Sequence, residues 1–180
     1  MGRGRIEERG YLVDNSILQK LSRSQSIRER FREVIEAYPV YTCPPQVLEY
    51  CCSARDSAEY LELRQDMELF TPAIAAPEQR LVHDMQQALW SNGLKRAAGN
   101  ADVLIAAYAV ANDLTLINCD RDFGFIAGAF RGALFRQEFV ASAASSAARS
   151  TGPPGAGTCR TGARPKPDPR SVPTRRGELS

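Results

Sequence analysis

Short apolar runs alternate with stripes of apolar residues that recur every three or four positions over roughly the first three-quarters of the chain. The runs are typical of buried strands, and the stripes are typical of helices with one buried face. They predict strands at residues 11–13, 40–43 and 114–117, and helices that begin at Ile17 and cover residues 27–38, 44–52, 57–67, 77–93 and 101–111. This alternation favours an α/β fold, a three-layer α/β/α sandwich with a mostly parallel central sheet.

Capping residues and apolar stripes also predict how several helices begin and which side they bury. Ser57 is expected to cap the helix that ends at Met67, and Pro77 is expected to open the next helix. The helix over residues 101–111 is expected to carry Leu104, Ile105 and Tyr108 on one side. The expected stripe of the helix over residues 44–52 consists of Val47, Leu48, Cys51 and Cys52.

The regular pattern fades near residue 131, and Ala, Ser, Gly, Pro, Thr and Arg dominate from Ala141 onward. Such a segment has few apolar side chains to offset the entropy of ordering it, so residues 131–180 are interpreted as a disordered basic tail. Residues 1–10 are interpreted as a flexible N-terminus and residues 11–130 as one folded domain. After Ala141, seven Arg and Lys residues stand against two acids, so the tail carries +5 and the remaining chain −3.

Histidine and cysteine usage excludes several classes of enzyme. The single histidine, His83, lies off the apolar stripe of its helix and is interpreted as a surface residue, so a histidine zinc site or a Ser–His pair is not expected. The five cysteines form no C-x-x-C pair, which favours a reduced, cytoplasmic compartment. With histidine sites excluded, hydrolytic chemistry in this chain must depend on carboxylates.

The sequence shows neither a membrane span nor a signal peptide. No apolar run approaches the roughly 20 residues that span a bilayer, and residues 1–10 lack the apolar core of a signal peptide.

Four acids stand where an α/β sheet can bring them together. Asp14 and Asp120 follow apolar strands, while Glu49 and Asp102 lie near the starts of helices. Each has a simpler structural explanation when taken alone, as a helix cap, a turn residue or a solvated surface acid. Together they predict a metal site, because neighbouring carboxylates about 4 Å apart repel by on the order of 4 kcal/mol unless cations lie between them. Hard oxygen ligands select Mg²⁺ or Mn²⁺, and the expected substrate is a phosphodiester.

Four segments of the sequence resemble, in order and spacing, the motifs of PIN-domain toxins of the VapC type. The segments are Tyr-Leu-Val-Asp14-Asn-Ser16, Val-Leu-Glu49-Tyr, Ala-Asp102-Val-Leu-Ile-Ala-Ala-Tyr-Ala and Leu-Thr-Leu-Ile-Asn118-Cys-Asp120-Arg-Asp122-Phe123. The resemblance covers about residues 11–126 and makes residues 11–130 a PIN-like nuclease domain. It implies a Mg²⁺-dependent endoribonuclease, with Mn²⁺ as a second possible ion, that cuts structured RNA such as tRNA or ribosomal RNA. It also implies a VapB-type antitoxin as partner, and a homodimer.

The resemblance also implies roles for individual residues. Asp14, Glu49, Asp102 and Asp120 resemble the catalytic acidic quartet of the family. The metal ligands implied are Asp14, Asp102, Asp120 and Asp122. Ser16 resembles a hydroxyl that fixes metal or phosphate, and Asn118 a polar neighbour that orients the site. For Ser16 a helix cap is an equally good interpretation, and for Asn118 a turn residue.

Two departures from the family pattern keep an alternative function open. Residues 95–100 stand where the family has a short apolar segment ahead of the third acid, and residues 128–141 stand where it has a last edge strand. The main alternative is a PIN-fold protein that binds an antitoxin but has lost catalysis through its altered C-terminus. A haloacid dehalogenase-type phosphatase is disfavoured because Ser16 stands where that class needs a second Asp. A dinucleotide-binding module is disfavoured because no G-x-G-x-x-G follows the first strand.

Overall fold

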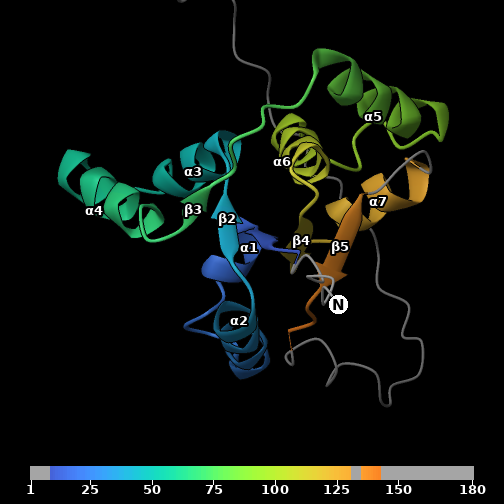
Figure 1. Cartoon of the computed structure of the whole chain (residues 1–180). Coiled ribbons are helices and arrows are strands. Elements are labelled where there is room, and N and C mark those ends of the chain that lie inside the picture. Colours follow the sequence, from blue (N-terminus) through green and yellow to red (C-terminus); the bar gives the residue numbers. More distant parts are fainter. Residues whose placement is uncertain (1–8, 131–134, 143–180) are drawn as a thin grey trace, which may run out of the picture. The chain divides into compact units, whose positions relative to one another are not determined.

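A computed structural model describes residues 9–130 and 135–142 of the 180-residue chain, and the elements and contacts below lie within these residues. Five strands form one sheet in the order β3-β2-β1-β4-β5, and every pairing between them is parallel (Figure 1). The strands are β1 (Tyr11–Val13), β2 (Val40–Thr42), β3 (Thr71–Pro72), β4 (Thr115–Asn118) and β5 (Arg136–Phe139). The three predicted strands are present within a residue of their expected bounds, and β3 and β5 were not predicted.

Seven helices of the described residues flank this sheet. They are α1 (Asn15–Leu18), α2 (Gln25–Ala37), α3 (Pro44–Cys51), α4 (Ser57–Met67), α5 (Gln79–Ser91), α6 (Asn100–Ala111) and α7 (Asp122–Ala129). The predicted cap of α4 was wrong by one residue, because the Asp56 side chain accepts hydrogen bonds from the amides of Ala58 and Glu59. The helix expected from Ile17 is only the single turn α1, which ends before Leu21.

The sheet buries both of its faces, which is why its central strands are apolar throughout. Leu12 pairs in register with Leu116, and both belong to a core shared with α5, α6 and α7. Val13 pairs with Ile117, and both belong to a second core shared with α1 and α2. Figure 1 shows α2 on one side of the sheet and α5 and α6 on the other. The predicted three-layer α/β/α sandwich is therefore confirmed.

Two helices are rotated relative to the predicted stripes. In α3, Gln46 and Cys51 are buried, whereas Leu48 is 59% exposed and Cys52 is exposed. In α6, Leu104 is 36% exposed, and the buried side chains are Val103, Ile105, Ala106, Ala107 and Ala109. Cys51 and Ile105 are buried as predicted, but Leu48, Cys52 and Leu104 are not, because a buried glutamine and several alanines complete the packed faces. The leucines are left beside a cavity between α3 and α6.

Strand β5 corrects the predicted end of the folded domain at residue 130. Its residues pair with β4 from Arg136↔Thr115 to Phe139↔Asn118, so they belong to the sheet and not to the tail. The strand has little apolar alternation, and Glu138 instead accepts hydrogen bonds from Arg30 at 2.6 and 3.0 Å. The expectation that residues 128–141 lack the family's last edge strand was also wrong, because β5 is such a strand. Residues 1–8, 131–134 and 143–180, on which the remaining tail and N-terminus predictions fall, lie outside the described residues.

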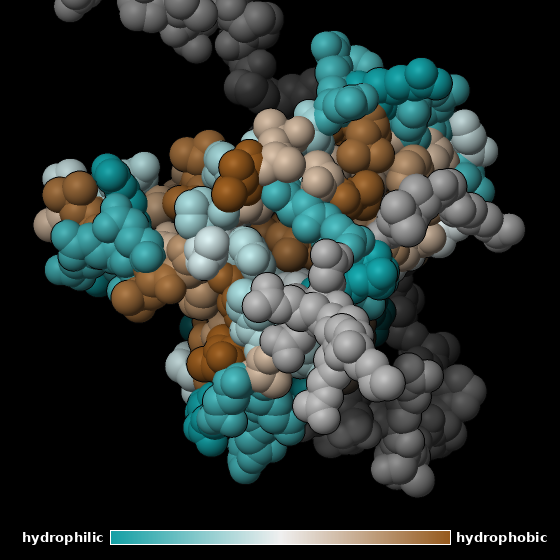
Figure 2. Space-filling view, in the orientation of Figure 1, coloured by the Kyte–Doolittle hydropathy of each residue, from teal (hydrophilic) through white to brown (hydrophobic). Residues whose placement is uncertain are grey.

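Hydrophilic side chains cover the outer surface of several helices (Figure 2). Figure 2 shows hydrophilic residues over α2 and α5, with apolar residues exposed over α3. His83 is exposed on α5, as expected from its position off the stripe. Within the part of the chain that the structure describes, no helix is long and apolar enough to span a bilayer.

Candidate active site at the carboxyl ends of the strands

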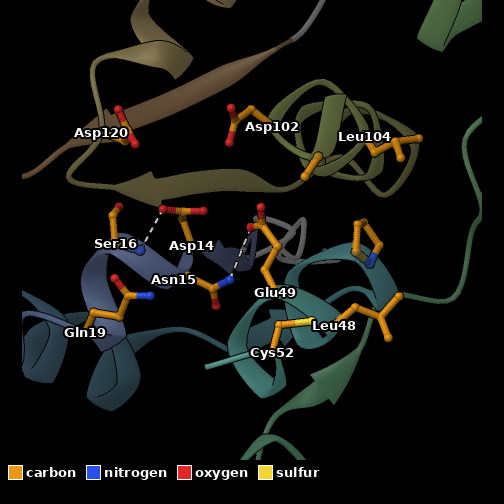
Figure 3. Close-up of a pocket in the computed structure, with 12 residues that line it drawn as sticks. Asp14, Asn15, Ser16, Gln19, Leu48, Glu49, Cys52, Asp102, Leu104 and Asp120 are labelled. Atoms are coloured by element: carbon orange, nitrogen blue, oxygen red, sulfur yellow. Dashed lines mark hydrogen bonds between the residues drawn. The ribbon is translucent and has the colours of Figure 1, made fainter. Parts of the chain in front are cut away.

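The four predicted acids line a single cavity of about 590 Å³ (Figure 3). Asp14 follows β1 and Asp120 follows β4, and these two strands are neighbours in the sheet. Glu49 comes from α3 and Asp102 from the first turn of α6. The carboxyl ends of parallel strands meet at one edge, where α/β sheets bind their ligands. The complete lining is Asp14, Asn15, Ser16, Gln19, Pro45, Leu48, Glu49, Cys52, Ala101, Asp102, Leu104 and Asp120.

Asp14 is held in place by the turn that it caps. Its side chain is almost fully buried, at 5% exposed for the residue, and its Oδ2 accepts a hydrogen bond from the Ser16 amide at 2.8 Å. Burial raises the pKa of Asp14, the Ser16 and Asn15 hydrogen bonds lower it, and the nearby Asp120 charge raises it further. The Ser16 hydroxyl accepts a hydrogen bond from the Cys119 amide at 2.9 Å. Ser16 therefore links the Asp14 turn to the loop that carries Asp120.

Asp102 lies in the first turn of α6 and folds back on the residue that precedes the helix. Its Oδ2 accepts a hydrogen bond from the Gly99 amide at 2.7 Å. A side chain at position 99 would bring its Cβ to 3.0 Å from that oxygen, so glycine suits the close approach. Burial raises the pKa of Asp102 to about 6, the Gly99 hydrogen bond lowers it, and the charges of Asp14, Glu49 and Asp122 raise it. The unusual segment at residues 95–100 thus ends in a helix cap that positions the third acid.

Glu49 is oriented by two buried amides that sequence reasoning missed. The Asn15 side chain donates to Glu49 Oε2 at 3.3 Å (Figure 3) and to the Gln46 carbonyl at 3.0 Å. Gln46, with no exposed surface, donates in return to Asn15 Oδ1 at 2.8 Å. Burial raises the pKa of Glu49, and the charge of Asp14 raises it further. The only sequence signals for these residues were an amide next to Asp14 and a polar residue one position ahead of an apolar stripe.

Asn118 and Asp122 lie around Asp120 without lining the cavity. Asn118 is fully buried, and its Oδ1 accepts a hydrogen bond from the Asp120 amide at 3.2 Å. Asp120 Oδ1 in turn accepts a hydrogen bond from the Asp122 amide at 3.1 Å, which forms the turn into α7. Burial raises the pKa of Asp122, and the charge of Asp120 raises it further. Asn118 thus fixes the backbone of Asp120. Asp122 contacts Asp120 but does not line the cavity with the four acids.

The charges of the cavity suit a divalent cation. Its lining contains four acids and no Lys, Arg or His, and burial together with mutual repulsion raises the pKa of three of them. Among the described residues, no three acid, histidine or cysteine side chains lie close enough together to ligate one ion directly. Mg²⁺ is nonetheless compatible with this spacing, because it keeps several waters and uses only one or two carboxylates. Apart from the Cys52 thiol, the possible ligands in this lining are oxygens, and oxygen ligands favour Mg²⁺ and Mn²⁺ over zinc.

Comparison with known families identifies the fold that carries this cavity. The model of the PIN domain family matches residues 11–129. The chain belongs to the PIN domain family. PIN domains are generally nucleases and typically use divalent metal ions, which agrees with the acidic cavity. No curated protein matches the sequence significantly.

Solved structures of similar fold include bacterial VapBC complexes. VapBC2 from Rickettsia felis, bound to a DNA fragment from its promoter, has a TM-score of 0.54 at 16% identity, over 72% of this chain and 97% of the other. DNA-bound VapBC from Salmonella typhimurium has a TM-score of 0.55 at 16% identity, over 73% of this chain and 98% of the other. VapBC-1 from nontypeable Haemophilus influenzae has a TM-score of 0.51 at 18% identity, over 72% of this chain and 96% of the other. At these identities the likeness establishes the PIN fold.

Proposed function

We propose that this PIN domain is the toxin of a VapC-type toxin–antitoxin pair, a Mg²⁺-dependent endoribonuclease that cuts structured RNA of the tRNA or ribosomal RNA class. The observation that carries the proposal is the cavity in which four acids, from the turn after β1, from α3, from α6 and from the β4–α7 loop, meet with no cationic side chain in the lining. The likeness to VapBC structures supports the toxin assignment. Mn²⁺ is expected to substitute for Mg²⁺.

The residues of the cavity suit different roles in phosphodiester hydrolysis. Asp14, Asp102 and Asp120 would hold the cation, one or two of them directly and the others through its bound waters, with Asp122 as an auxiliary acid beside Asp120. When bound, the cation supplies an activated water and neutralises charge at the phosphate. Glu49 is suited to accept a proton, because Asn15 fixes its orientation and burial raises its pKa. Ser16 and Asn118 position Asp120 through the backbone amides of the loop that it shares with Cys119.

Cleavage of RNA by the purified protein tests the proposal. Cleavage is expected with Mg²⁺ or Mn²⁺, to stop in excess chelator, and to be lost in Asp14→Asn, which keeps the acceptor for the Ser16 amide but loses the charge. Asp66→Asn, on the exposed surface of α4, is the matched control and should cleave normally. Full activity in chelator, or in Asp14→Asn, would contradict the metal-dependent mechanism.

The inactive alternative, an antitoxin-binding protein without catalysis, depended on a missing edge strand. The structure has that strand in β5, so the alternative loses the observation that favoured it. The same assay decides the matter, since a protein that binds a VapB-type antitoxin but never cleaves RNA would support the alternative. Co-expression with a candidate antitoxin should yield a stable complex, and sedimentation of the toxin alone should show the proposed homodimer.

A further inference from the structure

A second hollow, of about 380 Å³, lies directly beside the acidic cavity. Asp120 lines both of them, so the two meet at the end of β4. The second hollow lies between α7 and β5, and its lining is mostly apolar, unlike a second acidic site. Its lining residues are Asp120, Arg121, Gly124, Phe125, Gln137 and Phe139.

Two phenylalanines form the apolar part of this hollow. Phe125 is 42% exposed and Phe139 is 48% exposed, although Phe123 on the same helix is completely buried in the core. Helix α7 thus directs one aromatic ring into the protein and another to the surface beside the acids. Exposed aromatic rings next to a nuclease centre are suited to stack the bases of single-stranded nucleic acid, and such stacking tolerates any base.

A buried amide fixes the polar group of the hollow. The Asn118 side chain donates to Gln137 Oε1 at 2.8 Å, so the orientation of the Gln137 amide is set from inside the protein. Gln137 Nε2 is left on the side of Gly124, 3.7 Å from where a Cβ at that position would lie. Among the described residues Nε2 makes no hydrogen bond, so a donor is presented to whatever occupies the hollow.

Arg121 gives the hollow a positive charge, which the lining of the acidic cavity lacks. It is exposed, and within residues 9–130 and 135–142 it forms no ion pair. An arginine suits a phosphate oxygen, with planar N–H donors that match its geometry. A strand whose scissile phosphate lies at the four acids would therefore meet aromatic rings, an amide donor and a cation in its next nucleotide.

We propose that this hollow binds the unpaired nucleobase adjacent to the cut, packed against Phe125 and Phe139 and hydrogen-bonded to the Gln137 amide, with Arg121 on the neighbouring phosphate. The inference rests on the proposed function, because it assigns RNA as the occupant. It predicts that the enzyme requires a nucleotide flipped out of any duplex next to the cleavage site. The selection of loops over stems in structured RNA would then come from this hollow.

Binding of a short, fluorescein-labelled single-stranded RNA tests the proposal, measured by anisotropy with Ca²⁺ so that the strand stays intact, as verified on a gel. Phe125→Leu and Phe139→Leu, which keep apolar bulk but lose the aromatic face, should each weaken binding about tenfold, while Phe125→Tyr should bind like wild type. Trp90→Leu removes another aromatic residue, 55% exposed on α5, and should have no effect. Arg121→Gln should reduce the slope of log affinity against log salt by about 0.7, the value for one phosphate contact of a single strand.

An abasic nucleotide distinguishes stacking from general damage to the fold. Removing the base next to the cut should weaken binding to wild type but have little further effect on Phe125→Leu. Unchanged RNA binding in both phenylalanine variants would overturn the proposal while leaving the nuclease function intact. Loss of antitoxin binding with normal RNA binding would also overturn it, because the hollow would then be a protein-docking site. An absence of any RNA cleavage by wild type would instead count against the proposed function.

Discussion

At the scale of single residues, Asn15 links the stability of the fold to the orientation of Glu49, the acid that is proposed to accept a proton. Its amide contacts Glu49, the Gln46 carbonyl and the Gln46 side chain. Asn15→Ala is expected to destabilise the protein by about 1 to 3 kcal/mol, because a buried glutamine amide loses its acceptor. It should also lower kcat, since Glu49 loses its orienting donor. Denaturant unfolding and steady-state cleavage measure the two effects.

Gln46→Met separates these effects. It removes the same side-chain hydrogen bond but leaves the Gln46 carbonyl and the Asn15–Glu49 contact in place. We expect it to lower stability while keeping kcat near wild type. Equal losses of kcat in Gln46→Met and Asn15→Ala would show that Asn15 acts only through the packing of α3.

Asp102 illustrates the energetic cost of burying a carboxylate in the proposed cation site. Its pKa is raised from 3.8 to about 6, so the folded protein binds this proton more tightly than the unfolded chain. Its charge therefore opposes folding, and in chelator the stability contributed by the protonated form is lost as the pH rises from about 4 to about 6. At neutral pH, Asp102→Asn is expected to stabilise the metal-free protein by about 1 kcal/mol, since water in the open cavity screens part of the repulsion.

Thermal melting against pH measures this effect in wild type and Asp102→Asn. The variant should show a flatter profile between pH 4 and about 6 and should no longer cleave RNA. Added Mg²⁺ should raise the melting temperature of wild type more than that of the variant, since ligand binding stabilises the folded state. A variant that melts lower than wild type at neutral pH would show that the Gly99 contact outweighs the repulsion.

At the scale of elements, the sequence predicted the strands and helices that bury apolar side chains. The central strands β1, β2 and β4 are short apolar runs, and their burial on two faces makes the pattern clear. The edge strands were missed because β3 has two exposed residues, and β5 is attached by polar contacts from distant segments. The four acids were found from their motifs. The sequence did not predict the roles of Asn15, Gln46 and Gln137. Their hydrogen-bond partners are distant in the sequence and become neighbours only in the folded chain.

Glu138 reinforces the pairing of β5 with β4 by joining the strand to α2 and β1. Arg30 holds its carboxylate with two hydrogen bonds, the Tyr11 hydroxyl donates at 3.2 Å, and Arg30 lowers the pKa of Glu138. Glu138→Gln is expected to destabilise the protein by about 1 kcal/mol at neutral pH, as for a partly buried bidentate pair. A lowered carboxyl pKa stabilises the fold above the ordinary value of 4.5. The difference from wild type should therefore shrink as the pH falls below 4.5 through the lowered pKa.

Glu33→Gln is the matched control for Glu138→Gln, because Glu33 also pairs with Arg30, at 2.8 Å, but its side chain is 64% exposed. Its unfolding free energy should stay within a few tenths of a kcal/mol of wild type. Equal effects of the two substitutions would mean that the charge of Arg30, and not the attachment of β5, determines the outcome.

At the scale of the whole molecule, charge is divided between the segment after Ala141 and the rest of the chain. That segment carries +5 and the remainder −3, while the cavity that is proposed to cut RNA is lined by four acids. An acidic nuclease domain repels the phosphate backbone unless cations or a basic segment compensate. If RNA is the substrate, as proposed, the basic segment is suited to recruit it without sequence preference, and the proposed metal site to perform the chemistry.

Two truncated proteins test this division of labour. A chain ending at Ser142 keeps β5 and Val140, which is 8% exposed, and should melt like the full chain. A chain ending at Phe130 loses the four register pairs between β5 and β4 and the Arg30–Glu138 contact, so it should melt much lower. The Ser142 truncation should keep kcat but bind RNA more weakly and with a flatter salt dependence, by about 0.7 in slope for each lost phosphate contact. The two truncations separate the edge strand from the basic segment. A large loss of melting temperature on cutting after Ser142 would show that the sheet depends on residues beyond β5. An unchanged salt slope in that truncation would show that the seven basic residues do not contact RNA.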